Sequence, residues 1–462
     1  MFPLQTNEFL NNVCEKIKYK PIRNEISEEL KNHIEEQKEA FIQSGIEENV
    51  AEEKAIENMG SAEELGKKLN KIHRPKLDWK LVLLILILIA FGILVTIIRM
   101  KNEISLDYRY SRGTNMGNYI LALGIGMILS TLIYFIDYRK MSKYPMLFYI
   151  IATLCFIMPY GIGGTLNGIR YLYVFSTLIL PMVIAIPLYI IAFVGFIYNI
   201  NKESKIKITT QSGKNININI IKIIVLSIIS LHFVMTQSIA TAFILGLVYM
   251  IISTIKLSKL EKKGKKYIAI LWGIPLILFL SVILIYVASD FGKYIITILI
   301  DSFYPGIDPN GSGWGAMDRN EIIKSAKLFG EVEGIGLEYR PCFEQGEAWA
   351  FISILANYGW VVSLGMLLAI ILFNVKLIKN AINIKEEYGK WLTIGISTMF
   401  ILQSLFNVAM NLGFGIIANF NLPLVSYGLI SLIMNMMSLA LVLSVYRRKD
   451  INTYETKYEK VV

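Results

Sequence analysis

Hydrophobic positions follow two patterns along this chain, and the change between them falls near residue 79. Before it, apolar residues recur at the three-to-four spacing of one helix face, as at Ile26, Leu30 and Ile34. After it, apolar runs of about 20 residues, the length that crosses a bilayer, alternate with short polar segments. The pattern predicts an all-α polytopic membrane protein with a small helical part at its N-terminus.

The N-terminal part is predicted to be a three-helix bundle over residues 1–78. Its helices are expected from Ile26 to Gly45, from about Glu47 to Met59, and from Ser61 to a residue before Pro75. Glycine after a last turn and serine before a first turn are common end and cap residues. No signal peptide is expected ahead of the bundle, because the first long apolar run begins only near Leu81. The bundle is expected to be either a cytoplasmic tether or a regulatory or oligomerising module.

Ten apolar runs are candidate membrane spans. They lie near 80–99, 117–136, 145–159, 172–197, 218–234, 237–256, 267–289, 349–375, 391–413 and 422–446. With ten spans, the basic segments 137–143, 202–222, 256–266 and 376–390 and the C-terminal tail share one side. A single loop, which holds Arg109 and Arg112, is also basic but lies on the opposite side. We therefore expect both termini in the cytoplasm, a membrane domain over 79–448 and a cytoplasmic tail over 449–462.

Composition narrows the class of protein further. The chain has 462 residues, of which 54% are hydrophobic and 18% charged, against about 25% charged in soluble domains. This excludes an ordinary soluble enzyme, a disordered chain and a disulfide scaffold. Its cysteines and histidines are few and scattered, so no metal site or cofactor is predicted, although a divalent cation stays possible. The net charge of +10 fits basic cytoplasmic loops, and no nucleic-acid partner is expected.

The longest predicted outer loop, about 290–348, is acidic and opens with turn residues. A short amphipathic helix is expected within it, at about 318–329. Long ordered loops often carry function. Glu347 lies where this loop enters the predicted eighth span, and a carboxylate there could have a raised pKa and act as a general base.

Polar residues inside spans are costly and are candidates for function. Asn407 and Asn411 are four residues apart, so they share one helix face. They either form hydrogen bonds between helices or line a polar cavity for a head group. Arg170, near the outer end of the third or the start of the fourth span, either extends toward the membrane surface or binds a phosphate.

Residues 45–65, with a Glu-rich helix before them, resemble the permease-prefix (HAAS-type) domain that precedes some membrane proteins. That resemblance covers about 60 residues, within the N-terminal domain 1–78. It implies a regulatory role for the domain and no catalytic residue.

A second resemblance covers about residues 80–448. Its strongest motifs lie between Asn407 and Arg448: Asn411-Leu412-Gly413, then Pro423-Leu424-Val425-Ser426-Tyr427-Gly428, then Ser431 to Met436. Asn167-Gly168-Ile169-Arg170 and Ala350 to Gly359 add to it. These segments look like the signature of the FtsW/RodA/SpoVE (SEDS) family of bacterial plasma-membrane proteins.

This resemblance implies polymerisation of peptidoglycan glycan strands from lipid II in cell division, elongation or sporulation, usually beside a transpeptidase partner. The family's essential Asp falls on Ala348, so the neighbouring Glu347 is the expected catalytic residue, with Asp318 as the alternative. The expected substrate-binding residues are Arg170, Arg319, Asn407, Asn411, Ser426 and Tyr427.

The sequence departs from the family pattern elsewhere. Segments that carry charged residues in the family align here with Pro181–Ile184, Pro187 and Thr236–Ala242, where those charges are absent. The family's Gly-Tyr-Gln becomes Met317-Asp318-Arg319. Three functions therefore stay open. They are a divergent glycosyltransferase, a non-catalytic regulatory or scaffold protein of the cell-wall machinery, and a polyprenyl-lipid transporter.

Overall fold

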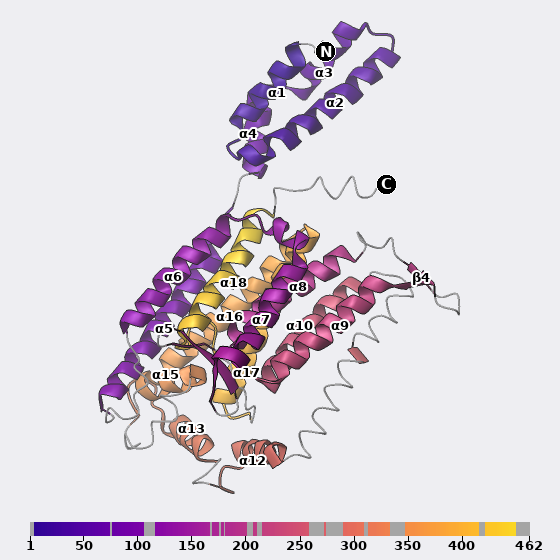
Figure 1. Cartoon of the computed structure of the whole chain (residues 1–462). Helices are drawn as coiled ribbons and strands as arrows, with labels where there is room; N and C mark the ends of the chain where they lie inside the picture. The colour runs from indigo at the N-terminus through magenta and orange to yellow at the C-terminus, as the bar shows by residue number, and fades with distance from the viewer. Residues whose placement is uncertain are drawn as a thin grey trace. The chain divides into compact units, whose positions relative to one another are not determined.

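The fold is taken from a computed structural model of the chain (Figure 1). The residues described are 4–73, 76–105, 116–166, 169–174, 177–179, 181–200, 207–209, 215–257, 272–273, 290–308, 313–332, 347–414 and 421–449. They divide into two compact units. One holds residues up to Asp78 together with those from Tyr446 onward, and the other runs from Trp79 to Val445.

The N-terminal unit contains four α-helices and one 3-10 turn among its described residues. They are α1 (Leu4–Lys16), η1 (Lys20–Ile22), α2 (Arg23–Gln43), α3 (Glu48–Met59) and α4 (Ala62–His73). The predicted three-helix bundle is therefore wrong by one helix. The missed helix α1 supplies Phe9, Leu10 and Val13 to the core of this unit, where they cover the apolar face of α2.

The C-terminal unit is a bundle of apolar helices. Eight helices of the described residues are long and apolar enough to cross a membrane, and a ninth, α9 (Ile218–Met235), has a shorter apolar stretch. The eight lie in α5 (Trp79–Ser105), α6 (Met116–Phe135), α7 (Pro145–Ile162), α8 (Pro181–Asn199), α10 (Ile239–Leu257), α16 (Trp360–Asn383), α17 (Glu387–Asn411) and α18 (Leu429–Arg447). The predicted seventh span, 267–289, lies outside the described residues except for 272–273.

Helix α8 is at the centre of the bundle and packs against α7, α9, α10 and α17. Two-thirds of its membrane-length window is buried, against a fifth to a half for the other spans. Small residues permit this packing: a Cβ on Gly395 of α17 would come within 2.7 Å of Ile190. Backbones at such sites approach closely, as is typical of helices that pack in membranes.

The start of the fourth span differs from its prediction. Residues 164–179 form a small antiparallel sheet of three strands, β1 (Gly164–Leu166), β2 (Ile169–Val174) and β3 (Thr177–Ile179), before α8 begins. Residue Thr165 pairs with Arg170, and Leu172 pairs with Ile179. An apolar run does not by itself distinguish a strand from a helix, and the sheet shortens the predicted span 172–197. A second hairpin pairs β4 (Lys207–Thr209) with β5 (Asn215–Asn217).

The predicted eighth span is two helices. It starts as η4 (Glu347–Trp349) and α15 (Ala350–Tyr358), and α16 follows after a break at Gly359, where φ is +83°. The Gly359 site is also tight, because a Cβ there would lie 2.7 Å from the Lys327 carbonyl oxygen. A glycine suits both conditions. The break leaves α15 as a short helix whose first six residues are all buried.

Two helices of the predicted outer loop lie at the same end of the bundle as α15: α12 (Asp290–Phe303) and α13 (Trp314–Ser325) (Figure 1). The helix expected at about 318–329 is therefore displaced toward the N-terminus. It ends at Ser325, and the chain after it bonds to the neighbouring helices instead. The Lys327 carbonyl accepts from the Trp360 amide at 3.0 Å, and the Val332 amide donates to the Ala356 carbonyl at 2.9 Å.

A further 3-10 turn, η2 (Tyr138–Lys143), joins α6 to α7 at the opposite end. The last predicted span, 422–446, also begins later than expected, because α18 starts at Leu429 and residues 421–428 form a turn.

Candidate functional site

The C-terminal end of α17 is where most of the predicted site residues meet. Asn407 and Asn411 are both fully buried, and their Nδ2 groups donate to the same acceptor, the Ala348 carbonyl, at 2.8 and 3.0 Å. Asn411 also donates to the backbone carbonyl of Asn407 at 2.8 Å. Two buried amides thus fix the turn that begins at Glu347.

Asn411 also bonds to α15. The Ile352 amide of α15 donates to Oδ1 of Asn411 over 3.4 Å. Amides inside a membrane bundle need such partners, because lipid offers none. The contacts favour hydrogen bonding between helices over an open polar cavity at these two positions. Their direct binding of substrate stays a prediction.

Arg319 joins α13 to this end of α17. Its side chain is 3% exposed. It donates to the Met410 carbonyl in the last turn of α17 and to the Ser302 carbonyl at the end of α12, each at 3.4 Å. A cation suits the carbonyl-rich end of a helix. Burial lowers the pKa of the guanidinium, but an arginine still stays protonated at neutral pH.

Asp318 is the neighbour of Arg319 on α13 and is equally buried, with 4% of its surface exposed. Its Oδ2 atom has no hydrogen-bond partner within the described residues. Burial, with a smaller contribution from the charge of Glu321, raises the pKa of this carboxyl to about 6. A carboxyl group with a pKa near the working pH is suited to proton transfer.

Two of these hydrogen bonds involve adjacent residues at the end of α17. The Met410 carbonyl accepts from Arg319, and the Asn411 side chain donates to the Ala348 carbonyl. The backbone segments that carry Asp318 and Glu347 are therefore both bonded to the last turn of α17. Helices α13 and α15 also pack against each other. The structure therefore brings together Asp318, Arg319, Asn407 and Asn411 around the turn that starts at Glu347. We refer to this arrangement as the α17 terminus.

The Ser-Tyr motif forms a separate cluster at this end of the bundle. Ser426 is buried and closes the turn before α18, accepting from the Leu422 amide through Oγ at 2.7 Å. Leu424, within that turn, has a φ of 65°, a conformation that costs a non-glycine residue energy. Such strain persists only where surrounding structure imposes it, and the carbonyl of Leu424 lies against Gly92 of α5.

Tyr427 is covered by two residues that the sequence did not single out. The Arg99 guanidinium of α5 lies 4.8 Å from the centre of the Tyr427 ring, and Tyr119 of α6 stacks on it at 6.2 Å. Arg99 is 7% exposed. Only its place at the end of an apolar run could have marked it, because nothing in the sequence pairs it with Tyr427.

The other predicted site residues lie elsewhere or are described by backbone alone. Arg170 is in β2, opposite Thr165 of β1, on the sheet before α8 rather than at the α17 terminus. Glu347 is the first residue of η4. Their catalytic and binding roles stay predictions. Within the described residues, no group of three or more His, Cys, Asp or Glu side chains is placed to hold a metal ion.

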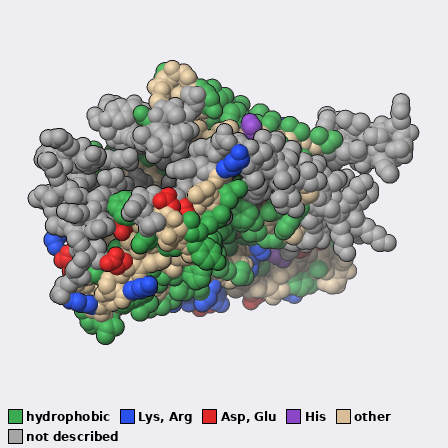
Figure 2. Space-filling model, turned by 90° about the horizontal axis from the view of Figure 1, so that it is seen from below, with side chains coloured by type: hydrophobic (Ala, Val, Ile, Leu, Met, Phe, Trp, Pro, Cys, Tyr) green, Lys and Arg blue, Asp and Glu red, His purple; other side chains and the backbone are tan. Residues whose placement is uncertain are grey.

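The surface at this end mixes charge with apolar area. Seen from below, acidic and basic side chains lie close together and are bordered by hydrophobic ones (Figure 2). The exposed charged residues on or after α13 are Glu321, Lys324, Lys327 and Glu331. Lys101 at the end of α5 pairs with Glu331 at 3.6 Å.

Fold and site together define an all-α integral membrane protein with a cluster of polar residues at one end of its bundle.

Comparison with known proteins identifies the family. Residues 78–451 match the FtsW/RodA/SpoVE family, described as cell cycle proteins. The chain belongs to this family. The match covers the membrane unit, and the permease-prefix resemblance of the N-terminal unit stays a prediction.

Curated relatives match over a shorter stretch. A probable peptidoglycan glycosyltransferase FtsW of Thioalkalivibrio sp. (strain K90mix) is 31% identical over 153 residues, 32% of this chain and 38% of that protein. The peptidoglycan glycosyltransferase RodA of Treponema pallidum is 28% identical over 153 residues, 33% and 35% of the two chains. Stage V sporulation protein E of Bacillus subtilis is 28% identical over 149 residues, 31% and 39% of the two. The chain thus spans less than half of the length of these relatives.

Solved structures match over most of the chain. A chain from a study titled "Structural coordination of polymerization and crosslinking by a peptidoglycan synthase complex" aligns with a TM-score of 0.58 and 20% identity, covering 81% of this chain and 98% of that one. The rod shape determining protein RodA of Thermus thermophilus aligns with a TM-score of 0.51 and 17% identity, covering 81% and 97%. These likenesses establish the fold.

Proposed function

We propose that this protein polymerises glycan strands from lipid II at the bacterial plasma membrane. Family membership and relatives named as peptidoglycan glycosyltransferases support this function. The observation that carries it in this chain is the α17 terminus. There two buried asparagines hold the Ala348 carbonyl, at the position where the family carries its essential carboxylate.

In the proposed reaction, a sugar hydroxyl attacks the anomeric carbon of the growing strand. A new C–O bond forms there, the bond to the polyprenyl pyrophosphate breaks, and the hydroxyl proton passes to a carboxylate base. We assign the base to Glu347. The asparagines hold the carbonyl of the next residue, Ala348, and this supports the assignment, because a catalytic base acts best from a fixed backbone.

Asp318 is the second candidate for the base. Its supporting observation is the buried carboxyl with an unpartnered Oδ2 and a pKa of about 6. Arg319, and Arg170 from the sheet before α8, are the proposed cationic support for the pyrophosphate, where negative charge develops as the bond breaks. Ser426 and Tyr427 are proposed to contact the lipid-linked substrate.

Polymerisation of purified lipid II by the detergent-solubilised protein tests this proposal. Wild type is compared with Glu347→Ala and Asp318→Ala, each with and without a candidate transpeptidase partner, after folding is verified by size exclusion. Product that disappears only in Glu347→Ala supports Glu347 as base, and product that disappears only in Asp318→Ala moves the role to Asp318.

No product from folded wild type, with or without partner, would overturn the polymerase function. A regulatory or scaffold role in the cell-wall machinery, or transport of a polyprenyl lipid, would then be the remaining functions. The permease-prefix-like unit fits a regulatory input to either activity. By the positive-charge pattern of the loops, both termini are proposed to lie in the cytoplasm.

A further inference from the structure

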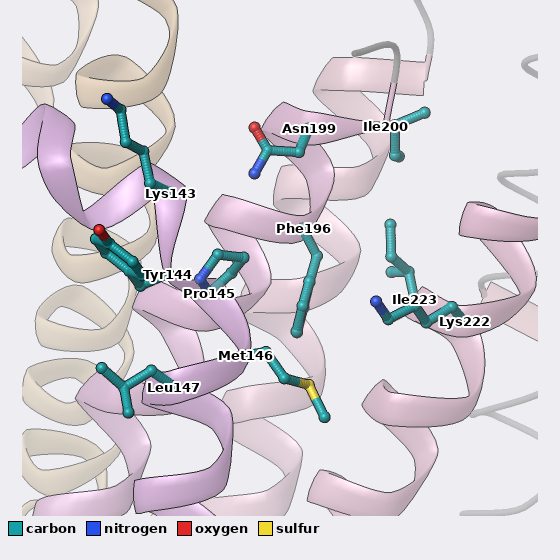
Figure 3. Close-up of a pocket in the computed structure, with 10 residues that line it drawn as sticks. All are labelled: Lys143, Tyr144, Pro145, Met146, Leu147, Phe196, Asn199, Ile200, Lys222 and Ile223. Carbon is teal, nitrogen blue, oxygen red and sulfur yellow. The ribbon is translucent and has the colours of Figure 1, made fainter. Parts of the chain in front are cut away.

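A cavity of about 250 Å³ opens at the end of the bundle opposite the α17 terminus, where α7 begins, α8 ends and α9 starts (Figure 3). Its rim carries Lys143 at the end of η2, Tyr144 just before α7, and Lys222 from α9. Phe196 and Asn199 of α8 form the wall between them. The cavity therefore lies at the end of two membrane-length helices, α7 and α8, and beside the start of α9.

The rim is positively charged. None of the described residues that line the cavity is acidic. Neither Lys143 nor Lys222 pairs with a carboxylate anywhere in the part of the chain that the structure describes. Both side chains are exposed. Two unpaired ammonium groups on one rim make an attractive site for a phosphate.

Contacts with α8 tie the turn that carries Lys143 to the cavity wall and bring Lys222 near it. Nδ2 of Asn199 donates to the Ser142 carbonyl at 2.8 Å, which ties the turn that carries Lys143 to the end of α8. The Lys222 ammonium lies 5.8 Å from the centre of the Phe196 ring, a cation–π distance. Figure 3 shows its nitrogen directed toward α8.

Beyond the basic rim, the wall becomes apolar and faces outward. Met146 and Leu147, on the first turn of α7, are 42% and 52% exposed. Only 22% of the membrane-length window of α7 is buried, so this face meets lipid chains. Tyr144 is 59% exposed between the two zones, a position typical of tyrosine at a membrane surface.

We propose that this cavity binds the headgroup of an anionic phospholipid. The phosphate lies between Lys143 and Lys222, and an acyl chain extends along Met146 and Leu147. Basic pockets between membrane helices bind anionic head groups on the cytoplasmic side, and the loop charges assign this end of the bundle to that side. Free phosphate would gain nothing from the apolar outer wall, so the two-zone lining favours a lipid. The proposal does not depend on the proposed enzymatic function.

The test is lipid binding to the full-length protein by native mass spectrometry, with phosphatidylglycerol titrated against phosphatidylcholine. The variant is Lys143→Gln/Lys222→Gln. Its matched control, Lys376→Gln/Lys379→Gln, removes two lysines from α16, outside the cavity. A rescue variant, Lys143→Arg/Lys222→Arg, keeps both charges and shows whether the site folds. A parallel titration uses inorganic phosphate.

Wild type should prefer phosphatidylglycerol, and the cavity variant should bind it on the order of 10-fold or more weakly, because each basic residue near the surface contributes to lipid attraction. The control and the rescue variant should bind as wild type does. Equal binding of both lipids by wild type would overturn the proposal, as would an equal loss in the α16 control. Inorganic phosphate that displaces phosphatidylglycerol at micromolar concentration would overturn it in favour of a free-phosphate site.

Discussion

The two ends of α17 are built in different ways. At its start, Glu386 accepts hydrogen bonds from the amides of Tyr388 and Gly389, at 2.9 and 2.6 Å, and from the Tyr138 hydroxyl at 3.0 Å. The next residue, Glu387, pairs with Lys256 of α10. At its other end, Arg319 and the asparagines are bonded, but Oδ2 of Asp318 has no partner within the described residues.

This difference indicates that the start of α17 has a structural role, whereas its other end holds a group that can react. A helix end with each carboxylate bonded is stabilised and has no group left to react. A buried carboxyl oxygen without a partner costs stability, and such costs persist where function requires them. The comparison predicts that changes at the α17 terminus affect both activity and stability, whereas changes at the start of α17 affect stability alone.

The largest effect is expected from Arg319→Ala. It removes the bonds to the Met410 and Ser302 carbonyls and leaves a buried gap, which should lower the free energy of unfolding by roughly 3–5 kcal/mol. Lipid II polymerisation per folded molecule should fall about 100-fold, as for loss of a charge-stabilising group. Unfolding midpoints in detergent and product gels measure both effects.

Arg319→Lys is the companion variant, because it keeps the charge but not the branched donor group. It should recover part of the stability and part of the activity. Full activity in Arg319→Ala would mean that Arg319 only caps α17.

Asn411→Ala is expected to have the next largest effect. It leaves the Ile352 amide without its side-chain acceptor and removes one of two donors to the Ala348 carbonyl, a cost of about 2–4 kcal/mol. Activity should fall as the Glu347 turn loosens. The matched control is Asn357→Ala on α15, since among the described residues Asn357 bonds within its own helix, to the Ser353 carbonyl. Equal losses in both variants would contradict a positioning role for Asn411.

Asp318→Asn is expected to stabilise the protein at neutral pH. Burial raises the pKa of Asp318 from 3.8 to about 6, so the unfolded chain loses this proton more readily than the folded one. The folded state is therefore penalised as pH rises from about 4 to about 6. Wild type should lose on the order of 2–3 kcal/mol relative to Asp318→Asn between pH 4 and pH 7.

Unfolding midpoints of the two proteins across that pH range measure this difference. Glu321→Gln serves as the electrostatic control, because removal of its charge should lower the pKa of Asp318 and shift the transition to lower pH. Parallel pH curves for wild type and Asp318→Asn would show that the carboxyl is not perturbed.

The smallest effect is expected at the start of α17. Glu386→Ala removes the cap and the acceptor for Tyr138, at a cost of about 1–2 kcal/mol. Polymerisation per folded molecule should stay at the wild-type rate, measured in the same assay after correction for folded fraction. A loss of activity beyond that fraction would end the distinction between the two ends of the helix.

Much of the fold was predictable because lipid imposes a simple rule. Apolar runs long enough to cross a bilayer predicted the membrane helices, and the spacing of Asn407 and Asn411 predicted their shared face, which their mutual hydrogen bond confirms. The errors occurred where an apolar run holds more than one element. Residues 172–174 and 177–179 lie in strands before α8, and Gly359 divides the predicted eighth span.

The site was only partly predictable for a related reason. The sequence marked the asparagines as polar residues in a predicted span, and the family resemblance marked Asp318 and Arg319 in the outer loop. It did not show that Arg319 and Ala348 bond to adjacent residues of α17, or that Arg99 covers Tyr427. These contacts join residues that are about 60 to more than 300 positions apart, and no local pattern records such distances.

The sequence by itself determined that this chain is an all-α membrane protein, that its basic segments share one predicted side, and which family motifs it carries. Hydrophobic length and charge placement fix these properties residue by residue. Only the tertiary structure decided which polar groups are satisfied and that Oδ2 of Asp318 has no partner among the described residues. That outcome depends on how helices distant in sequence pack, because each buried polar atom must find its partner on a neighbouring element.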